Sequence, residues 1–195
     1  MAFSLLWLVL IVQTLWMLIQ HLHHHASWGS MWYPLIFTIS FLLFALTHGR
    51  VLWITTLQRL LIGAAFLQAV SDRLGLLGPP GAPGIVWGDF AHFIHYTARV
   101  NSFMPATIIP SLAVLATIAE VFFGLALVLG IRISAAAIGS SILLFLFATA
   151  MTASGLSQFA YGVYMMAAGA LVLTTVDASW LSVDFYLKRG NRKTA

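Results

Sequence analysis

Two charged side chains, Arg59 and Glu120, stand inside long apolar runs of this sequence. A charge at the centre of a membrane costs at least about 2.5–3.5 kcal/mol on insertion scales, so an intramembrane charge marks a candidate functional site. At 1.5 Å per helical residue, Arg59 lies about 12 Å and Glu120 about 15 Å from the same membrane face. We therefore predict that the two side chains form a pair. Three roles fit them: a clamp that fixes helix register, a polar site for a quinone headgroup or a proton, or two independent water-facing charges.

Histidine is the second residue type that can carry chemistry here. Imidazole is the commonest metal ligand, so histidines gathered on one side of a membrane suggest a copper or zinc site. The same residues also fit a polar cap on helix ends, or histidines near a quinone or a partner surface. Bis-histidine haem b is disfavoured because it needs two histidines at similar depth on facing helices, and His48 stands alone on the other side. The candidate metal ligands are His21, His23, His24, His25, His92 and His95.

A third set of polar residues surrounds the longest loop. If Asp89–Val100 is helical, four polar residues with 3–4–3 spacing share one face of it, and two more end the preceding apolar run. Apolar walls with a few polar groups are typical of small-ligand sites, so we predict a shallow quinone or ligand site there. The alternative is a stripe that faces lipid headgroups or a neighbouring subunit. The candidate residues are Gln68, Asp72, Asp89, His92, Tyr96 and Arg99.

The composition requires a membrane around these groups. The 195 residues are 61% hydrophobic and only 7% charged, against about 25% charged in soluble domains, and the mean hydropathy is +0.98. The lack of cysteine excludes disulfides, thiolate metal ligands and thiol–disulfide catalysis within this chain. The basic cluster at the C-terminus is too small to indicate a nucleic-acid partner, and we interpret it as a topology signal.

Six apolar runs organise the chain. About 20 residues cross a membrane as a helix, and the second run is short for this. Long continuous runs satisfy their backbone hydrogen bonds in lipid as helices. We therefore expect an all-α membrane protein with six transmembrane helices. The runs are Phe3–Gln20, Trp32–Thr47, Val51–Val70, Pro105–Leu129, Ile133–Ala153 and Phe159–Val176.

Basic residues between the runs predict the orientation. With six spans, Arg50, Arg132 and the C-terminal tail fall on one side, which the positive-inside rule makes cytoplasmic. Arg73 and Arg99 fall on the other side, where neighbouring aspartates balance them. Both termini are therefore expected in the cytoplasm.

The loop over residues 72–104 divides into two parts. The Gly/Pro-rich stretch from Gly75 to Gly88 predicts tight turns and no helix. Its apolar members have little reason to face water, so we expect it to fold back over the bundle. The stretch Asp89–Val100 predicts an amphipathic helix that lies on the membrane surface or caps the bundle.

From about Thr56 to the tail, the chain resembles the DoxX family of bacterial membrane proteins. The pattern shared with the family is an arginine in the first core helix and a glutamate shortly before a glycine in the following one. The matching segments are Gln58–Phe66, Asp72–Gly84, Trp87–Phe90 and Ala119–Gly130.

The resemblance implies a four-helix membrane bundle over residues 51–180, in a bacterial inner membrane. The family's namesake is a small subunit of an archaeal thiosulfate–quinone oxidoreductase, and most members have no assigned reaction. Residues 1–50 fall outside the resemblance and add a helical hairpin; residues 181–195 form a basic cytoplasmic tail.

Our functional expectation is an accessory or quinone-proximal subunit of a membrane redox complex, with quinone as the candidate cofactor and other membrane subunits as partners. The rivals are an outer-face metal-binding membrane protein, which could be an enzyme, and a purely structural subunit of a larger assembly.

Overall fold

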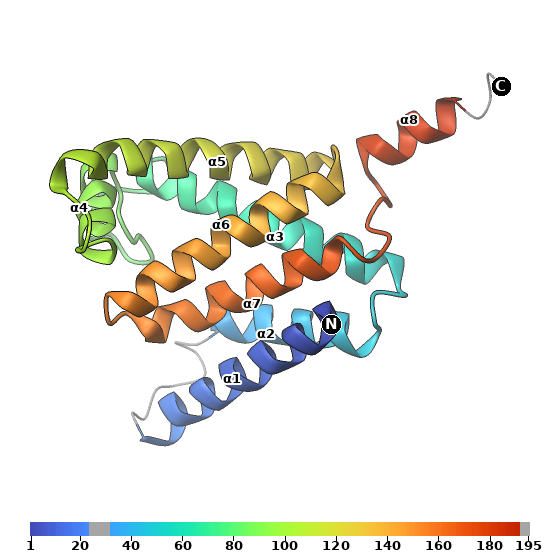
Figure 1. Ribbon diagram of the computed structural model, residues 1–195, viewed down its shortest axis with the longest axis horizontal. Coiled ribbons are helices and arrows are strands. Elements are labelled where there is room, and N and C mark those ends of the chain that lie inside the picture. Colours follow the sequence, from blue (N-terminus) through green and yellow to red (C-terminus); the bar gives the residue numbers. More distant parts are fainter. Residues whose placement is uncertain (24–31, 192–195) are drawn as a thin grey trace.

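The computed structural model describes residues 1–23 and 32–191, which form α-helices and one short 3₁₀-helix but no strand (Figure 1). The all-α expectation is confirmed for these residues. The elements are α1 (Ala2–His23), α2 (Trp32–Leu46), α3 (Leu52–Arg73), α4 (Phe90–Val100), η1 (Ala106–Ile108), α5 (Ile109–Leu129), α6 (Ile133–Ala153), α7 (Ser157–Leu173) and α8 (Val183–Asn191).

Four segments are long and apolar enough to cross a membrane: α1, α3, η1 with α5, and α6. The helices α2 and α7 are apolar but have 15 and 17 residues, so they reach about 22 and 26 Å at 1.5 Å per residue. The membrane-helix character predicted by composition is thus confirmed, and four of the six predicted spans meet the length required.

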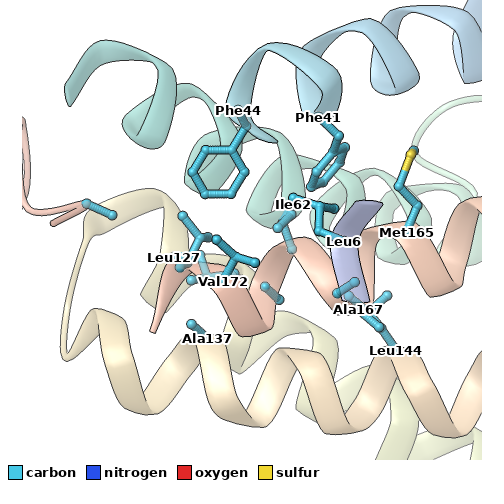
Figure 2. Packing of buried hydrophobic residues seen from close by; sticks show 14 of the residues in the cluster. Leu6, Phe41, Phe44, Ile62, Leu127, Ala137, Leu144, Met165, Ala167 and Val172 are labelled. Carbon is cyan, nitrogen blue, oxygen red and sulfur yellow. The ribbon is translucent and has the colours of Figure 1, made fainter. Parts of the chain in front are cut away.

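The bundle is built from antiparallel neighbours. The helices α6 and α7 pack together most extensively, α3 packs along α5, and α1 lies against α7. The buried core joins Phe41 and Phe44 of α2 to Leu127 of α5 and Met165 of α7 (Figure 2). Large rings from α2 thus fill the space beside small residues of α7, which is how helices approach closely in lipid.

The bundle has two distinct ends. At one end, here called the tail end, the rings of Phe3 and His48 meet with centroids 5.4 Å apart, and Gly49 lies against Val176. The start of α1 and the helix α8 both lie at this end (Figure 1). The opposite end, here called the α4 end, carries the loop 74–89 and α4.

The helix α4 is amphipathic, as predicted. Phe93, Thr97 and Val100 are buried against the bundle, whereas His95 and Arg99 are exposed. The loop before it contains no helix, also as predicted, and folds back on itself. At Gly88, φ is +72° and a Cβ would lie 2.3 Å from the backbone nitrogen of Pro80, so only glycine fits there.

One element was not predicted. Residues 183–191, which the sequence analysis placed in the basic tail without predicting a helix, form α8. The signal was present in the sequence, because Ser182 caps the helix by accepting a hydrogen bond from the backbone N–H of Phe185 at 3.0 Å.

Candidate functional site

An ion pair deep in the α4 end joins α3 to α5. The Nη1 atom of Arg73 lies 2.5 Å from Oε2 of Glu120, and the two side chains are 2% and 5% exposed. Oε2 of Glu120 has no further partner among the described residues. The predicted contact between Arg59 and Glu120 is therefore wrong, and Glu120 pairs instead with a residue that the sequence pattern places in the loop.

The register of the two helices explains the error. Gly63 of α3 faces Gly124 of α5, where a Cβ on Gly63 would lie 2.9 Å from the carbonyl oxygen of Gly124. Gly63 is eleven residues from the tail-end start of α3, but Gly124 is only five from the tail-end terminus of α5. The helix α3 thus extends about 9 Å further toward the tail end, at 1.5 Å per residue. Equal distances from the helix ends do not give equal depths.

Arg73 reaches Glu120 by folding back along its own helix. Its Nε donates to the carbonyl oxygen of Ala69 at 3.1 Å, and its Nη1 donates to Oγ1 of Thr117 at 3.1 Å. This direction follows helix geometry, because Cα–Cβ bonds tilt toward the helix N-terminus. A charge at the last residue of α3 is thereby placed inside the bundle instead of at the membrane surface.

Two aromatic rings cover the Arg73 guanidinium from the loop side. Its central carbon lies 3.7 Å from the centroid of the Phe93 ring and 5.0 Å from that of Trp87. The two rings meet edge to face with centroids 5.2 Å apart. Cation–π attraction is strongest where water is excluded, so these rings both stabilise the charge and seal it.

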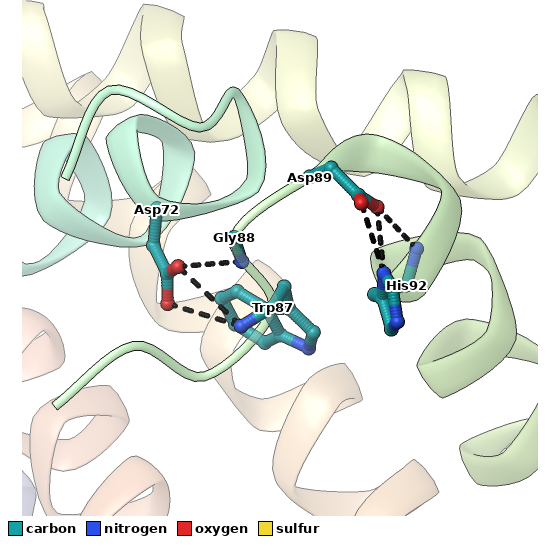
Figure 3. Close-up of polar contacts among 5 residues, drawn as sticks. All are labelled: Asp72, Trp87, Gly88, Asp89 and His92. Atoms are coloured by element: carbon teal, nitrogen blue, oxygen red, sulfur yellow. Dashed lines mark hydrogen bonds and ion pairs between the residues drawn. The ribbon is translucent and has the colours of Figure 1, made fainter. Parts of the chain in front are cut away.

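Asp72, the neighbour of Arg73, holds the loop in place. Its carboxylate accepts the backbone N–H of Val86 at 2.9 Å and that of Gly88 at 3.0 Å, with longer contacts to the N–H of Trp87 (Figure 3). Hydrogen bonds to a charged acceptor are about twice as strong as neutral ones. Asp72 therefore positions Trp87 over Arg73, and its oxygens point at backbone rather than into a ligand space.

The predicted polar stripe on α4 does not come together as one pocket. Asp89 caps α4 by accepting the backbone N–H of His92 at 2.8 Å and pairs with the same residue's ring through Nδ1 at 2.9 Å (Figure 3). The cap lowers the pKa of the Asp89 carboxyl, chiefly through that backbone hydrogen bond. Arg99 is exposed, as is Gln68 on α3.

Tyr96 is the one member of that stripe that joins the buried cluster. Its ring meets Trp87 edge to face with centroids 5.6 Å apart, and burial raises the pKa of its hydroxyl. The indole Nε1 of Trp87 is buried and has no hydrogen-bond partner among the described residues. An unpaired buried donor is uncommon in native proteins and calls for a structural or functional reason.

The histidine set gives no metal centre within the described part of the chain. No group of three His, Asp or Glu side chains that could hold a metal ion occurs in residues 1–23 and 32–191. His24 and His25 lie outside the described residues, as does the side chain of His23. His92 contacts Asp89, and His95 is exposed on α4.

Arg59 instead contacts the segment before α8, at the tail end of the bundle. It is fully buried, and its Nη2 donates to the carbonyl oxygen of Leu181 at 3.0 Å. It forms no ion pair among the described residues, and its Nε and Nη1 atoms are without partners there. Arg59 and Glu120, the two charges that the sequence places inside apolar runs, thus make their contacts toward opposite ends of the bundle.

Sequence reasoning missed most of the residues around Glu120. Arg73 was assigned to a loop, and the roles of Thr117, Trp87 and Phe93 had no signal beyond their residue types. No protein-family model, no characterised protein and no solved structure matches this chain. Function must therefore be inferred from the chemistry of the sites, because a helical bundle by itself does not specify an activity.

Proposed function

We propose that this protein is a DoxX-like integral membrane protein that serves as an accessory subunit of a membrane redox complex. The resemblance in residues 56–180 supplies the class of complex. The observation that carries the accessory role is the closed pair of Arg73 and Glu120, at 2% and 5% exposure.

A group that binds substrate or passes protons must be reachable by them. The Arg73 guanidinium is instead enclosed by Ala69, Thr117, Glu120 and the rings of Phe93 and Trp87. A buried pair of this kind ties together the elements that supply its parts, here α3, α5, α4 and the loop. This supports a clamp that holds the α4 end in one arrangement over a chemical role for Glu120.

The outer surface of the bundle fits the same role. The helix α5 exposes Leu115, Ile118 and Phe122, each at least 60% accessible. Such a face can contact lipid. It can equally pack against transmembrane helices of neighbouring subunits, because such helices associate through packing and not through a hydrophobic driving force.

Copurification tests the proposal. The tagged protein is extracted from its native membrane in mild detergent, and its partners are identified by mass spectrometry. We expect redox subunits to copurify in fixed proportion. Deleting the chain should reduce the amount of assembled complex while leaving the activity per assembled complex within about twofold. The accessory role would be rejected if the protein is isolated without partners and if its deletion leaves the redox complexes unaltered.

Quinone proximity is the second candidate, favoured by the unpaired Nε1–H of Trp87 beside the Tyr96 ring. A quinone carbonyl oxygen is an acceptor that suits an indole N–H. Trp16 offers a matched control, because its Nε1 is also buried without a partner among the described residues but it stands on α1. Quinone extracted from purified protein should fall for Trp87→Phe and stay unchanged for Trp16→Phe. Equal retention by both variants would count against the quinone candidate.

The same preparation tests the histidine hypothesis. Bound copper or zinc, measured by elemental analysis after dialysis, should reach one ion per chain if the outer-face histidines form a site. Values far below that in wild-type protein would remove this rival.

A further inference from the structure

The surface formed by Trp180, Leu181, Val183, Tyr186 and Leu187, here called the α8 surface, is exposed and apolar. Leu181, Tyr186 and Leu187 are 55%, 63% and 64% accessible. Val183, Tyr186 and Leu187 share one helix face, because residues three and four apart are neighbours on a helix. We propose that the α8 surface anchors the protein's tail end to membranes that contain anionic lipids.

The charge on this segment is the first support. Lys188 and Arg189 continue α8, and Arg192 and Lys193 follow in the sequence. Clusters of basic residues beside an amphipathic helix attract anionic headgroups. Trp and Tyr prefer the membrane–water boundary, which fits Trp180 and Tyr186. Aromatic and aliphatic side chains that are followed in the sequence by four basic residues match a negatively charged lipid surface.

The single acidic residue of α8, Asp184, forms its hydrogen bonds with another helix. The carboxylate of Asp184 accepts the backbone N–H groups of Arg132 and Ile133 at 3.1 and 3.2 Å, at the start of α6. A carboxylate is stabilised at a helix N-terminus, where unpaired N–H groups and the helix dipole are positive. Asp184 therefore acts as a cap for α6, and the rest of α8 has a purely basic charge.

The position of α8 is fixed by contacts with the bundle. Oγ1 of Thr55 donates to the carbonyl oxygen of Asp177 at 3.0 Å, Nη2 of Arg59 donates to that of Leu181 at 3.0 Å, and the N–H of Asp184 donates to the carbonyl oxygen of Gly130 at 3.1 Å. These bonds tie residues 177–184 to the ends of α3 and α5, where the membrane-crossing segments stop. The helix α8 thus leaves the bundle at its tail end (Figure 1).

The absence of cysteine makes the test direct. A single Tyr186→Cys variant is reconstituted into nanodiscs of phosphatidylcholine alone and of phosphatidylcholine with phosphatidylglycerol. Labelling by a water-soluble maleimide is then timed. We expect labelling to be slower by at least about tenfold in the anionic discs, because each basic residue near the surface adds attraction. The difference should shrink as salt is raised, since screening weakens the attraction.

Charge-neutral variants supply the controls. Replacing Lys188, Arg189, Arg192 and Lys193 by Gln in the Cys variant should bring the ratio between the two lipids to within twofold. The double substitution Arg50→Gln and Arg132→Gln, which removes two other charges from the tail end, should leave most of the effect. Equal labelling in both lipids would overturn the proposal. Slow labelling in both, unaffected by neutralising the tail, would show that a second copy or another protein surface covers α8 instead.

Discussion

Arg73 directs its side chain inward from the last residue of α3, against the usual tendency of arginines at membrane boundaries to reach outward. Glu120 supplies the reason, because a carboxylate buried inside a membrane bundle needs a partner. The result is a charge pair that Trp87 and Phe93 cover from the loop side, while Asp72 holds the loop in place. At the scale of residues, the polar groups of the α4 end therefore support one another.

Removing one member of this pair should destabilise the protein more than removing both members. We expect Arg73→Leu and Glu120→Leu each to lower the free energy of unfolding in detergent by about 3–5 kcal/mol, because each leaves an uncompensated buried charge. The double variant should lose less than either single variant, because it leaves no uncompensated charge. Denaturant titration of all four proteins measures this.

The same cycle with Arg59 is the matched control. Arg59→Leu and Glu120→Leu should be additive to within about 0.5 kcal/mol, since the two residues share no contact. A larger coupling for Arg59 with Glu120 than for Arg73 with Glu120 would contradict the observed pairing.

Acid should loosen the start of α4. The pKa of Asp89 is lowered in the folded protein by the N–H of His92, so its cap is stabilising at pH values above the unfolded pKa of about 3.9. This contribution is lost as the pH falls through the lower folded pKa. After correction for the intrinsic rate, we therefore expect the His92 amide to exchange faster at pH values below the folded pKa of Asp89 than at pH values above about 3.9.

The Asp89→Asn variant isolates this effect. Asparagine also caps helices well but does not titrate. Its corrected exchange rate at His92 should stay constant over the same pH range. A wild-type profile equally flat, or a variant profile equally steep, would mean that another group controls the helix start.

At the scale of elements, the contact between α3 and α5 decides which charges meet. It depends on two glycines that let the backbones approach, since a Cβ on Gly63 would lie 2.9 Å from the carbonyl oxygen of Gly124 and from Cγ2 of Val128. The helices α3 and α5 cannot slide or separate there without moving Arg73 away from Glu120.

Enlarging Gly63 should therefore destabilise the bundle. We expect Gly63→Ala to lower the free energy of unfolding by about 1–3 kcal/mol, as overpacking does in well-packed interiors. Gly162 of α7 has open space around its Cα, so Gly162→Ala should cause no loss. Thermal or denaturant unfolding of both variants makes the comparison, and equal losses would refute the packing explanation.

Over the whole molecule, the start of α1 and the helix α8 lie at one end of the bundle and the loop with α4 at the other (Figure 1). An even number of crossings produces this arrangement. The basic residues Arg50 and Arg132 also belong to the tail end, and the positive-inside rule predicts that this end faces the cytoplasm.

Single cysteines test this topology in intact cells. Cysteines at residues 1 and 195 should resist an impermeant reagent, whereas one at Leu76, an exposed position of the loop, should react. Opposite reactivity of the two termini would mean that one of the shorter helices, α2 or α7, does not cross.

Hydropathy and the exclusion of charge from lipid act residue by residue, so the membrane setting and the extent of most helices could be predicted from the sequence. The run Ile133–Ala153 became α6 with the same limits, and the Gly/Pro stretch stayed free of helix. It also marked Arg59 and Glu120 as residues in need of partners.

The identity of those partners follows from the packing of the helices and could not be predicted from the sequence. Partner choice depends on the axial offset between α3 and α5, which close packing at Gly63 and Gly124 sets and which no count from a helix end contains. The inward fold of Arg73, the aromatic cover from Trp87 and Phe93, and the bonds from Arg59 to residues 180–181 all follow from that packing. Contacts between distant segments depend on helix shape and loop path together. The sequence therefore predicts which charges are buried, but it does not predict which of them form a pair.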